Sequence, residues 1–531
     1  MMRGGRSRSR CDADRQSGLA GSPDRWIGGT SDGRLDPVTL PIPLNRRALA
    51  DLPSSIGRPA YDPAAVRPGI VHLGLGGFHR AHMARYTHAL MNRDAAALGW
   101  GIVGAGLLPA DRRMRDALAP QHHLYTLIER DGVSETVEVV GSLADVIFAG
   151  EDSAALLDAI ARPEIRIVSL TVTEHGYCLD PATKRLAPGH PPIAADLADP
   201  THPKSAIGIL VEGFRRRREA GARAFTALSC DNIQHNGHVL KQAVLDFAGR
   251  IDPALARWIE REARFPGTMV DRITPLTYPE DITGLAERHG IADAWPVVSE
   301  RFTQWVIEDD FIDGRPDWGA VGAQFVTDVS PYERMKLRLL NASHLAIAGL
   351  GCLIGYETID ETMRDDRIRR TMAALMDRET GPTLLPVPGI DLPAYKTELV
   401  ARLANPAIRD TVERVNTDAP LNYLLDPVRD RLAQGESIDL LALGIAAWMR
   451  RVRGVDEVGA PIDIRHPLAE TLRERAIEGG GDPAPLLAIT SLFGSLGEDD
   501  RFVSTVGRHL RAIYANGTAG ALDACLSALP A

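Results

Sequence analysis

The sequence predicts an α/β fold, with an N-terminal domain built on a doubly wound parallel sheet and a mostly α-helical C-terminal domain. Short, continuous apolar runs alternate with helical segments up to about residue 328, as expected for strands covered on both faces. Beyond Ser330 the chain reads as successive helices, with no strand alternation. The chain has 531 residues, more than one hydrophobic core usually holds, so two domains are expected.

The first domain begins with a strand, a tight turn and a helix. The run "GIVHLGLGG" from Gly69 is apolar and ends in glycines, and "HRAHMARYTHALMN" follows with helical character. A second strand is expected at residues 100–106, followed by a polar loop and the helix "RMRDALA". Further strands are expected at residues 165–174 and 224–230, each bounded by polar or glycine-containing segments.

The second domain is expected to be all helical. Helices are predicted at residues 334–356, 362–378, 392–403 and 437–452, and Asp482-Pro483 is an N-cap and first-turn proline that begins another. These patterns divide the chain into a disordered extension (residues 1–45), a dinucleotide-binding domain (46–328) and a helical substrate and catalytic domain (329–531). The extension is predicted from its Arg, Ser, Gly and Asp content and its lack of periodic apolar residues.

Composition narrows the range of partners. The formal net charge of -10 argues against a nucleic-acid or anionic-membrane partner, since both select basic faces. The most apolar stretch, residues 345–356, is too short to cross a bilayer and is expected to be a buried helix. Five scattered cysteines without a CxxC pair, and no apolar signal-peptide core, favour a reducing cytoplasm.

A glycine-rich turn follows the first strand. It consists of Gly74, Leu75, Gly76, Gly77, Phe78 and His79. Glycines at a strand-to-helix turn let the backbone approach a pyrophosphate, which then sits at the helix N-terminus, as in Rossmann-like domains. His79 replaces the third glycine of the usual fingerprint, and a merely structural tight turn explains the same glycines; the flanking strand and helix favour dinucleotide binding.

An acidic residue is also expected near the end of the second strand, to hold the adenosine ribose. Asp111 is the nearest candidate, although it lies further from Gly74 than the usual ~20 residues. An N-cap for the following helix explains Asp111 equally well. Arg112 and Arg113 beside it suit a 2′-phosphate, so NAD is expected and NADP stays open.

The segment "YERMKLRLLNASHL" carries Glu333, Lys336, Asn341 and His344. In an α-helix all four fall within an arc of about 140°, so they can converge on one small volume. A half-exposed helix with a Glu–Lys pair and a core histidine is the structural alternative.

A second polar segment, "SCDNIQHNG", follows the strand at residues 224–230, where open α/β sheets bind ligands. Asn232 and Asn236 are turn formers, but a carboxamide there can also donate to a substrate oxygen. No HExxH or comparable ligand spacing is present, so no metal is expected. Without a metal, a desolvated lysine can serve as the acid/base.

Together these motifs resemble the polyol-specific long-chain dehydrogenases, the group that contains mannitol 2-dehydrogenase and the hexuronate reductases. The resemblance runs from about Gly69 to beyond Arg414. It rests on "GLGGFHRAH", "TVTEHGYC", "SCDNIQHNG", "FPGTMVDRITP", "QWVIEDDF" and "KLRLLNASH" in that order. It implies metal-independent, NAD(P)-dependent oxidation of a CH–OH group, of the mannitol-to-fructose type, with a small-molecule substrate and a monomer or weak oligomer.

The resemblance also implies roles for individual residues. It makes Lys336 the catalytic general acid/base, Asn232 and Asn341 the groups that hold the substrate oxygen, His344 a positioning group and Glu333 the proton relay. Asp271 falls where the family has a cofactor-side aspartate, and Arg414 where it has a substrate-binding arginine.

Two departures from the mannitol enzymes leave the substrate open. His175 stands where those enzymes have glycine and uronate reductases have lysine, and the segment after Arg414 also differs. A hexuronate reductase, of the fructuronate-to-mannonate type, is therefore the second hypothesis, with His175 and Arg414 as the cations for a carboxylate. The third is a non-catalytic dinucleotide-binding protein, against which the intact set of Lys336, Asn341 and His344 argues.

Overall fold

The computed structural model describes residues 40–132, 134–180 and 183–529. The predicted disordered extension, residues 1–45, lies outside the described residues up to position 39. Its last residues are ordered: β1 (Ile42–Pro43) pairs in parallel with β10 (Ile291–Ala292), and Leu44 is buried. The prediction was wrong for this end of the extension, because Leu44 packs into a small core with Leu285 and Ile291.

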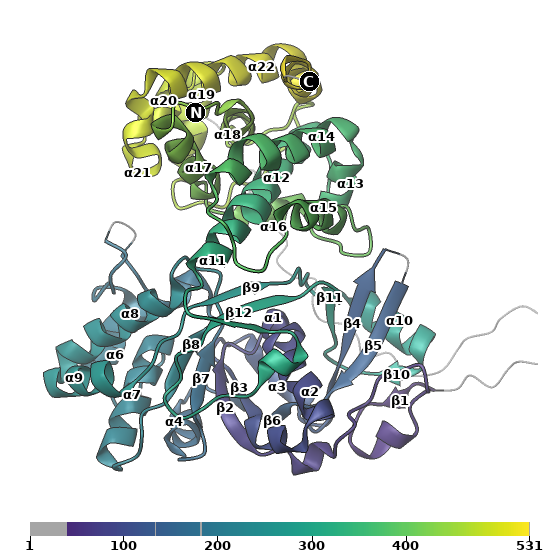
Figure 1. Ribbon diagram of the computed structural model, residues 1–531, viewed down its shortest axis with the longest axis vertical. Helices are drawn as coiled ribbons and strands as arrows, with labels where there is room; N and C mark the ends of the chain where they lie inside the picture. The colour runs from purple at the N-terminus through teal and green to yellow at the C-terminus, as the bar shows by residue number, and fades with distance from the viewer. Residues whose placement is uncertain (1–39, 133, 181–182, 530–531) are drawn as a thin grey trace, which may run out of the picture. The chain divides into compact units, whose positions relative to one another are not determined.

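A five-stranded parallel sheet organises the N-terminal domain (Figure 1). Its strands run in the order β6-β3-β2-β7-β8, and every neighbouring pair is parallel. Their bounds are β2 (Pro68–Leu73), β3 (Gly101–Gly106), β6 (Leu143–Phe148), β7 (Ile167–Leu170) and β8 (Thr226–Ser229). Since β3 and β7 flank β2 on opposite sides, the strand order reverses at β2, where such sheets bind ligands beyond their carboxyl ends.

Helices cover both faces of this sheet, which explains why its strands are largely apolar and mostly buried. Val71 packs into a core with Leu210 and Val244, whereas the adjacent Ile70 packs into another with Met83 and Tyr86. The helices of this domain are α1 (Gly77–Ala81), α2 (Met83–Arg93), α3 (Asp111–Leu118), α4 (Ala154–Ala161), α5 (Thr173–Gly176), α6 (Pro191–Ala198), α7 (Ala206–Glu219), α8 (Asn236–Ile251), α9 (Pro253–Glu262) and α10 (Pro279–His289). The predicted doubly wound parallel sheet is confirmed.

Two smaller sheets were not predicted. One has the order β11-β4-β5 and the other β13-β12-β9. Their bounds are β4 (Tyr125–Asp131), β5 (Ser134–Val140), β9 (Thr268–Asp271), β11 (Val297–Glu300), β12 (Gln304–Glu308) and β13 (Gln324–Val326). The strands β9 and β11 matter for function, because their last residues, Asp271 and Glu300, face the helical domain.

The C-terminal domain is helical throughout its described residues, as predicted. Its helices are α11 (Ser330–Lys336), α12 (Ala342–Ile354), α13 (Ile359–Arg364), α14 (Asp366–Leu375), α15 (Leu392–Leu403), α16 (Val412–Asp418), α17 (Asn422–Ala433), α18 (Asp439–Arg451), α19 (Ala469–Gly479), α20 (Ala484–Leu487), α21 (Thr490–Phe493) and α22 (Asp500–Ala528). The helix α18 is buried from Leu440 to Arg451 and packs between α12 and α22. The predicted helix at residues 362–378 is interrupted at Asp365, whose side chain caps α14.

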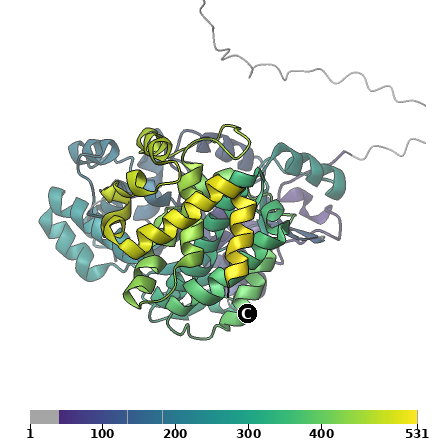
Figure 2. The same cartoon turned by 90° about the horizontal axis from the view of Figure 1, so that it is seen from above.

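The last helix, α22, contains a sharp corner (Figure 2). At Gly517 the backbone leaves helical geometry, with φ 72° and ψ 168°, a combination that is essentially restricted to glycine. Glu457 accepts hydrogen bonds from the backbone N–H and the hydroxyl of Thr518 and so holds the corner. The two arms of α22 therefore run in different directions.

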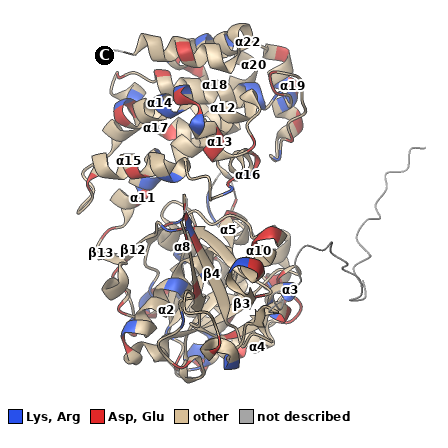
Figure 3. Cartoon of the chain, turned by 90° about the vertical axis from the view of Figure 1, so that its right-hand side faces the viewer, with Lys and Arg blue, Asp and Glu red and all other residues tan. Residues whose placement is uncertain are grey.

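One helical segment of the described residues, Ser330–Ile354, has the length and hydropathy of a membrane span, but 72% of its most apolar window is buried in the protein. This is typical of a core helix, and the prediction of a buried helix at residues 345–356 is confirmed. Acidic and basic residues are interspersed along both domains, so the face in Figure 3 has mixed sign.

Candidate active site

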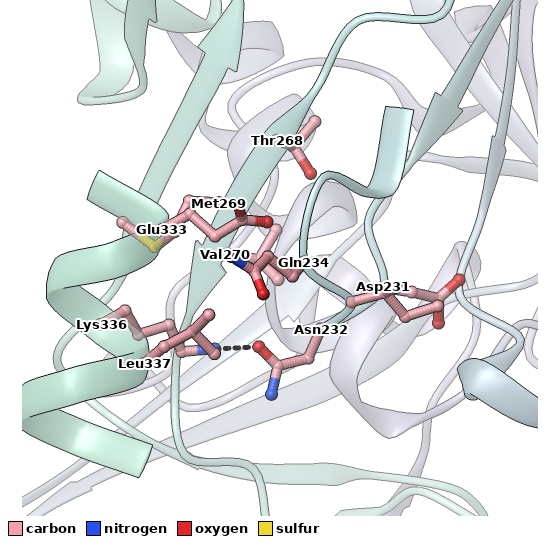
Figure 4. Close-up of a pocket in the computed structure, with 10 residues that line it drawn as sticks. Asp231, Asn232, Gln234, Thr268, Met269, Val270, Glu333, Lys336 and Leu337 are labelled. Atoms are coloured by element: carbon pink, nitrogen blue, oxygen red, sulfur yellow. Dashed lines mark hydrogen bonds between the residues drawn. The ribbon is translucent and has the colours of Figure 1, made fainter. Parts of the chain in front are cut away.

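Lys336 and Asn232 meet in a buried pocket below the first helix of the C-terminal domain. Lys336 is the last residue of α11 and is only 7% exposed, and its Nζ donates a 2.7 Å hydrogen bond to Asn232 Oδ1 (Figure 4). Asn232 comes from the loop after β8. Because its oxygen is occupied by Lys336, the amide nitrogen, which points away from Lys336 in Figure 4, is the atom that can donate to a ligand.

The helix that carries these residues is not a regular α-helix. A π-helical turn, Leu337–Asn341, separates α11 from α12, and the Ala342 N–H bonds to the Leu337 carbonyl five residues earlier. The sequence prediction placed Asn341 and His344 at 100° per residue. A π-helical residue turns through a smaller angle, so the turn rotates both residues back toward Lys336. Asn341 is 8% exposed and hydrogen-bonds the Tyr423 hydroxyl.

Burial is the largest influence on Lys336 and lowers the pKa of its ammonium group. The charge of Arg402 lowers it further, while Asp271 and Glu333 oppose the shift. The buried site therefore favours the neutral amine, the form that accepts a proton.

Glu333 lies one turn before Lys336 and is also buried. Its Oε1 accepts a 2.7 Å hydrogen bond from the backbone N–H of His235, and its Oε2 lies 3.5 Å from His235 Nδ1. Burial, together with the charges of Glu308 and Asp328, raises the pKa of Glu333 to about 7. The His235 ring is 55% exposed, so Glu333 links the buried site to a side chain in contact with solvent. No role for His235 was predicted from the sequence.

Glu333 gives a testable pH dependence of stability. A glutamate in the unfolded chain titrates near 4.5, whereas folded Glu333 titrates near 7, so between these values the native state binds more protons. The stabilisation from protonated Glu333 is complete below about pH 4.5 and is lost as the pH rises through about 7. The free energy of unfolding of Glu333→Gln, minus that of wild type, should rise by about 1–3 kcal/mol when the pH is raised from 5 to 8. Urea unfolding at the two pH values measures this difference.

Glu287→Gln is the matched control, because Glu287 is exposed on α10 and its replacement should shift stability equally at both pH values. An identical pH dependence in wild type and Glu333→Gln would show that Glu333 does not titrate in this range.

A buried ion cluster joins the two domains beside Lys336. Asp271, at the end of β9, accepts hydrogen bonds of 2.9 and 3.0 Å from Arg402 of α15, which also binds Glu300 at 2.8 and 2.9 Å. Burial alone would raise the pKa of Asp271, but the charge and hydrogen bonds of Arg402, together with the charges of Lys336 and His82, hold that pKa below its usual value. Asp271 was predicted from the sequence as a site residue, whereas its partners in the cluster, Arg402 and Glu300, were not.

His344 and Arg414 share a carboxylate. His344 Nε2 lies 3.2 Å from Asp410 Oδ2, and Arg414 makes a bidentate pair with Asp410 at 2.6 and 2.7 Å. The structure thus brings two predicted site residues together through Asp410, which the sequence analysis did not identify. The charge of Arg414 is balanced within the protein, so this arginine does not by itself make the site cationic.

His175, predicted on the substrate side, is exposed on the one-turn helix α5. The loop after β7 is fixed by Asp231, which accepts hydrogen bonds from the backbone N–H of Thr173 and the hydroxyl of Tyr177. The charge of Glu174 acts on Tyr423, the partner of Asn341, so this turn faces the helical domain.

The glycine-rich turn lies at the carboxyl end of β2, where the strand order reverses. Gly74 has φ +88°, and a Cβ there would lie 2.1 Å from the Thr171 carbonyl, so only glycine fits. Gly76 is exposed, a Cβ at Gly77 would touch only side-chain methyl groups, and the Phe78 ring stacks on His82. A backbone this open on one side suits close approach by a phosphate.

Asp111 lies at the neighbouring strand end. It is the first residue of α3, and its Oδ2 accepts a 2.9 Å hydrogen bond from the backbone N–H of Leu108. It therefore does not act as the N-cap, a position held by Ala110. Arg112 pairs with Glu151 and its guanidinium lies over the Phe148 ring.

The pocket around Lys336 is open to solvent, and the space within and in front of it amounts to about 240 Å³. Its lining residues are Asp231, Asn232, Ile233, Gln234, Thr268, Met269, Val270, Glu333, Lys336 and Leu337. A neutral amine, amide donors and a carboxyl group that titrates near neutral pH can take a proton from an alcohol and stabilise the oxygen that remains.

Two family models match most of the chain. Residues 68–320 match the family model described as the mannitol dehydrogenase Rossmann domain, and residues 328–514 match the mannitol dehydrogenase C-terminal domain. The chain is 46% identical over 459 residues to D-mannonate oxidoreductase of Escherichia coli, covering 85% of this chain and 94% of that protein. It is 41% identical over 492 residues to mannitol 2-dehydrogenase of Aspergillus fumigatus, covering 90% and 98%.

Two solved structures are similar over nearly their whole length. A ternary complex of Pseudomonas fluorescens mannitol 2-dehydrogenase with NAD and D-mannitol is 43% identical, with a TM-score of 0.86, covering 92% of this chain and 100% of that one. A D-sorbitol dehydrogenase in substrate-free form is 34% identical, with a TM-score of 0.80, covering 90% and 100%.

Proposed function

Because the chain belongs to the mannitol dehydrogenase family of oxidoreductases, we propose that it is an NAD-dependent polyol dehydrogenase that interconverts a polyol and a ketose. The observation that carries the proposal is the 2.7 Å contact between buried Lys336 and Asn232, which leaves an amide donor beside an amine whose pKa is lowered by burial. The balanced charge of Arg414 favours an uncharged polyol over a sugar acid.

In this mechanism the residues of the chain move one proton. Lys336, as the neutral amine, takes the proton from the hydroxyl on the carbon that is oxidised. Asn232 and Asn341 donate hydrogen bonds to that oxygen, and His344, held by Asp410, fixes its position. Glu333 then receives the proton and passes it by way of His235 to solvent. In the reducing direction Lys336 is the acid. No catalytic metal takes part.

The turn at Gly74, Gly76, Gly77 and Phe78 fits a dinucleotide, since Gly74 has a backbone that only glycine adopts and Gly76 is open to approach. NAD bound there supplies the hydride acceptor. Asp271, on the side of the cofactor, keeps its negative charge because Arg402 holds it. The protein contribution is to orient the reacting carbon and to keep the pocket dry.

Asp111 is proposed to select NAD over NADP, because a carboxylate at this strand end repels a 2′-phosphate. In Asp111→Ala we expect the ratio of the dissociation constant of NADPH to that of NADH to fall by about tenfold or more. The fluorescence of the reduced nicotinamide measures both constants. Asp116→Ala, on the exposed face of the same helix, is the control and should leave the ratio unchanged. A wild-type preference for NADP would instead point to Arg112 or Arg113.

The second candidate function is the oxidation of mannonate, and the 46% identity to D-mannonate oxidoreductase favours it. A panel of mannitol, arabinitol, sorbitol, mannonate and altronate, each with NAD and with NADP in the presence of EDTA, separates the two. The polyol proposal requires the highest kcat/KM with one of the three polyols. A preference for mannonate would move the function to the second candidate, and turnover lost to EDTA and restored by zinc, with the Tm unchanged, would remove the lysine mechanism.

A cytoplasmic location and a monomer or weak oligomer are further parts of the proposal. The four cysteines of the described residues, Cys178, Cys230, Cys352 and Cys525, are all free thiols, as in a reducing compartment. Size-exclusion chromatography with light scattering measures the oligomeric state.

A further inference from the structure

A cluster of three potential metal ligands lies in the helical domain, outside the candidate active site. Asp439, His509 and Cys525 each offer one ligand atom, and these atoms lie within 4.8 Å of one another. His509 Nε2 is 3.0 Å from Asp439 Oδ1, and Cys525 Sγ is 3.9 Å from Asp439 Oδ2. His509 and Cys525 are buried, while Asp439 is partly open to solvent.

The spacing suits a small tetrahedral ion. Zinc binds nitrogen, oxygen and sulfur at about 2.0–2.3 Å, which puts neighbouring ligand atoms about 3.3–3.8 Å apart. The separations of 3.0 and 3.9 Å lie just below and just above this range, and the third pair of ligand atoms lies within 4.8 Å, so the three atoms can close on one ion with small side-chain movements. One thiolate, one imidazole and one carboxylate are the donor types that zinc takes, and a water completes such a set.

The corner in α22 is what brings the ligands together. His509 and Cys525 are sixteen positions apart in the sequence, and in a straight α-helix their backbones would be about 24 Å apart. Gly517 lies midway between them, and its glycine-only backbone angles turn the second arm of the helix, so that Cys525 Sγ lies 3.9 Å from Asp439 at the start of α18. This explains why spacing in the sequence does not reveal the cluster.

Two neighbouring charges bear on the cluster. Arg508 pairs with Asp439, but its side chain is 57% exposed and is therefore free to swing away into solvent. Glu379 is buried under the start of α18, where it accepts hydrogen bonds from the backbone N–H groups of Leu440 and Leu441. Burial, with the charges of Asp439 and Glu379, raises the pKa of the Cys525 thiol to about 12, so the thiol is protonated in the metal-free protein.

We propose that Asp439, His509 and Cys525 bind one zinc ion, with water as the fourth ligand, and that the ion fastens the second arm of α22 to α18. On binding, the Cys525 thiol gives its proton to solvent, Zn–S, Zn–N and Zn–O bonds form, and Arg508 leaves Asp439. No electron is transferred. The site is structural and independent of the proposed dehydrogenase chemistry, because none of its residues belongs to the Lys336 pocket.

The test uses the full chain, stripped with EDTA and dialysed, and titrated with Co²⁺ and then Zn²⁺. We expect one equivalent of Co²⁺ to give the intense visible bands of tetrahedral coordination and a thiolate charge-transfer band, both lost when Zn²⁺ displaces it. Isothermal titration calorimetry in two buffers should show release of about one proton per zinc. At 100 times the dissociation constant of zinc, Tm should rise by about 3–5 °C.

Variants decide whether this cluster is the site. Cys525→Ser and His509→Gln should each weaken zinc binding by about 100-fold. Cys525→Ser should also lose the thiolate band of bound cobalt, and His509→Gln should lose its tetrahedral spectrum. Cys352→Ser, which changes another free thiol, should bind as the wild type does, and Arg508→Ala should bind several-fold tighter because Asp439 loses its competitor. Near-UV circular dichroism checks that each variant is folded. Equal zinc affinity in wild type, Cys525→Ser and His509→Gln, or an octahedral cobalt spectrum without a thiolate band, would overturn the proposal.

Discussion

Replacing Lys336 by alanine should abolish turnover while leaving NAD binding nearly unchanged. General-base assistance is typically worth ~10²–10⁴-fold, and kcat should fall by at least that much because the proton acceptor is removed. NAD binding should persist because the turn at Gly74 belongs to the other domain. Stopped-flow absorbance of NADH and a fluorescence titration with NAD measure the two effects separately.

Three controls make the result specific. Lys204→Ala, at an exposed lysine, should keep full activity, and an external primary amine should partly restore Lys336→Ala. Asn341→Ala should lower kcat without moving the pH profile, because an amide donates hydrogen bonds but does not titrate. A folded Lys336→Ala protein with near wild-type turnover would show that this helix is structural and that another residue carries the proton.

Of the substitutions proposed for this protein, Arg402→Met should lower the free energy of unfolding the most. The change leaves Asp271 and Glu300 facing each other in a buried site without their shared cation. Breaking a buried ion pair from one side costs about 3–5 kcal/mol, so urea unfolding should show a loss of this size. One of the two carboxyl groups should then take up a proton near neutral pH, so the loss should grow as the pH rises.

The same variant reports on Lys336, whose pKa is held down in part by the charge of Arg402. With that charge gone, the pH profile of kcat should move to higher pH in any Arg402→Met protein that folds. Arg402→Lys keeps the charge and should recover part of the stability and most of the profile. Arg370→Met, at an exposed arginine, is the control and should change neither the free energy of unfolding nor the pH profile of kcat. A stability loss below about 1 kcal/mol in Arg402→Met would mean that the cluster is not a net stabiliser.

The strands were predictable because both faces of the sheet are covered, which leaves runs such as residues 102–105 without a polar side chain. The meeting of Lys336 with Asn232 followed from the resemblance to the polyol dehydrogenases, which assigns both residues to one substrate oxygen, and not from either motif alone. The partners of Asp271 were not predictable, since Glu300 and Arg402 lie far along the chain and no local pattern links them. The π-helical turn was also invisible, because the same residues suit an α-helix and only packing selects the longer hydrogen bond.

The arginine bridge between the domains has a consequence for how ligands enter. Both carboxylates, Asp271 and Glu300, end strands of the sheet domain, while Arg402 sits on a helix of the other domain. A hinge motion that separated the domains would have to break the ion pairs of Arg402 with Asp271 and Glu300 while these groups are still buried. Breaking them there costs several kcal/mol of free energy. We therefore expect the two domains to behave as a rigid frame during turnover. Substrate should enter through small movements at the rim, where the one-turn helix α5 is exposed.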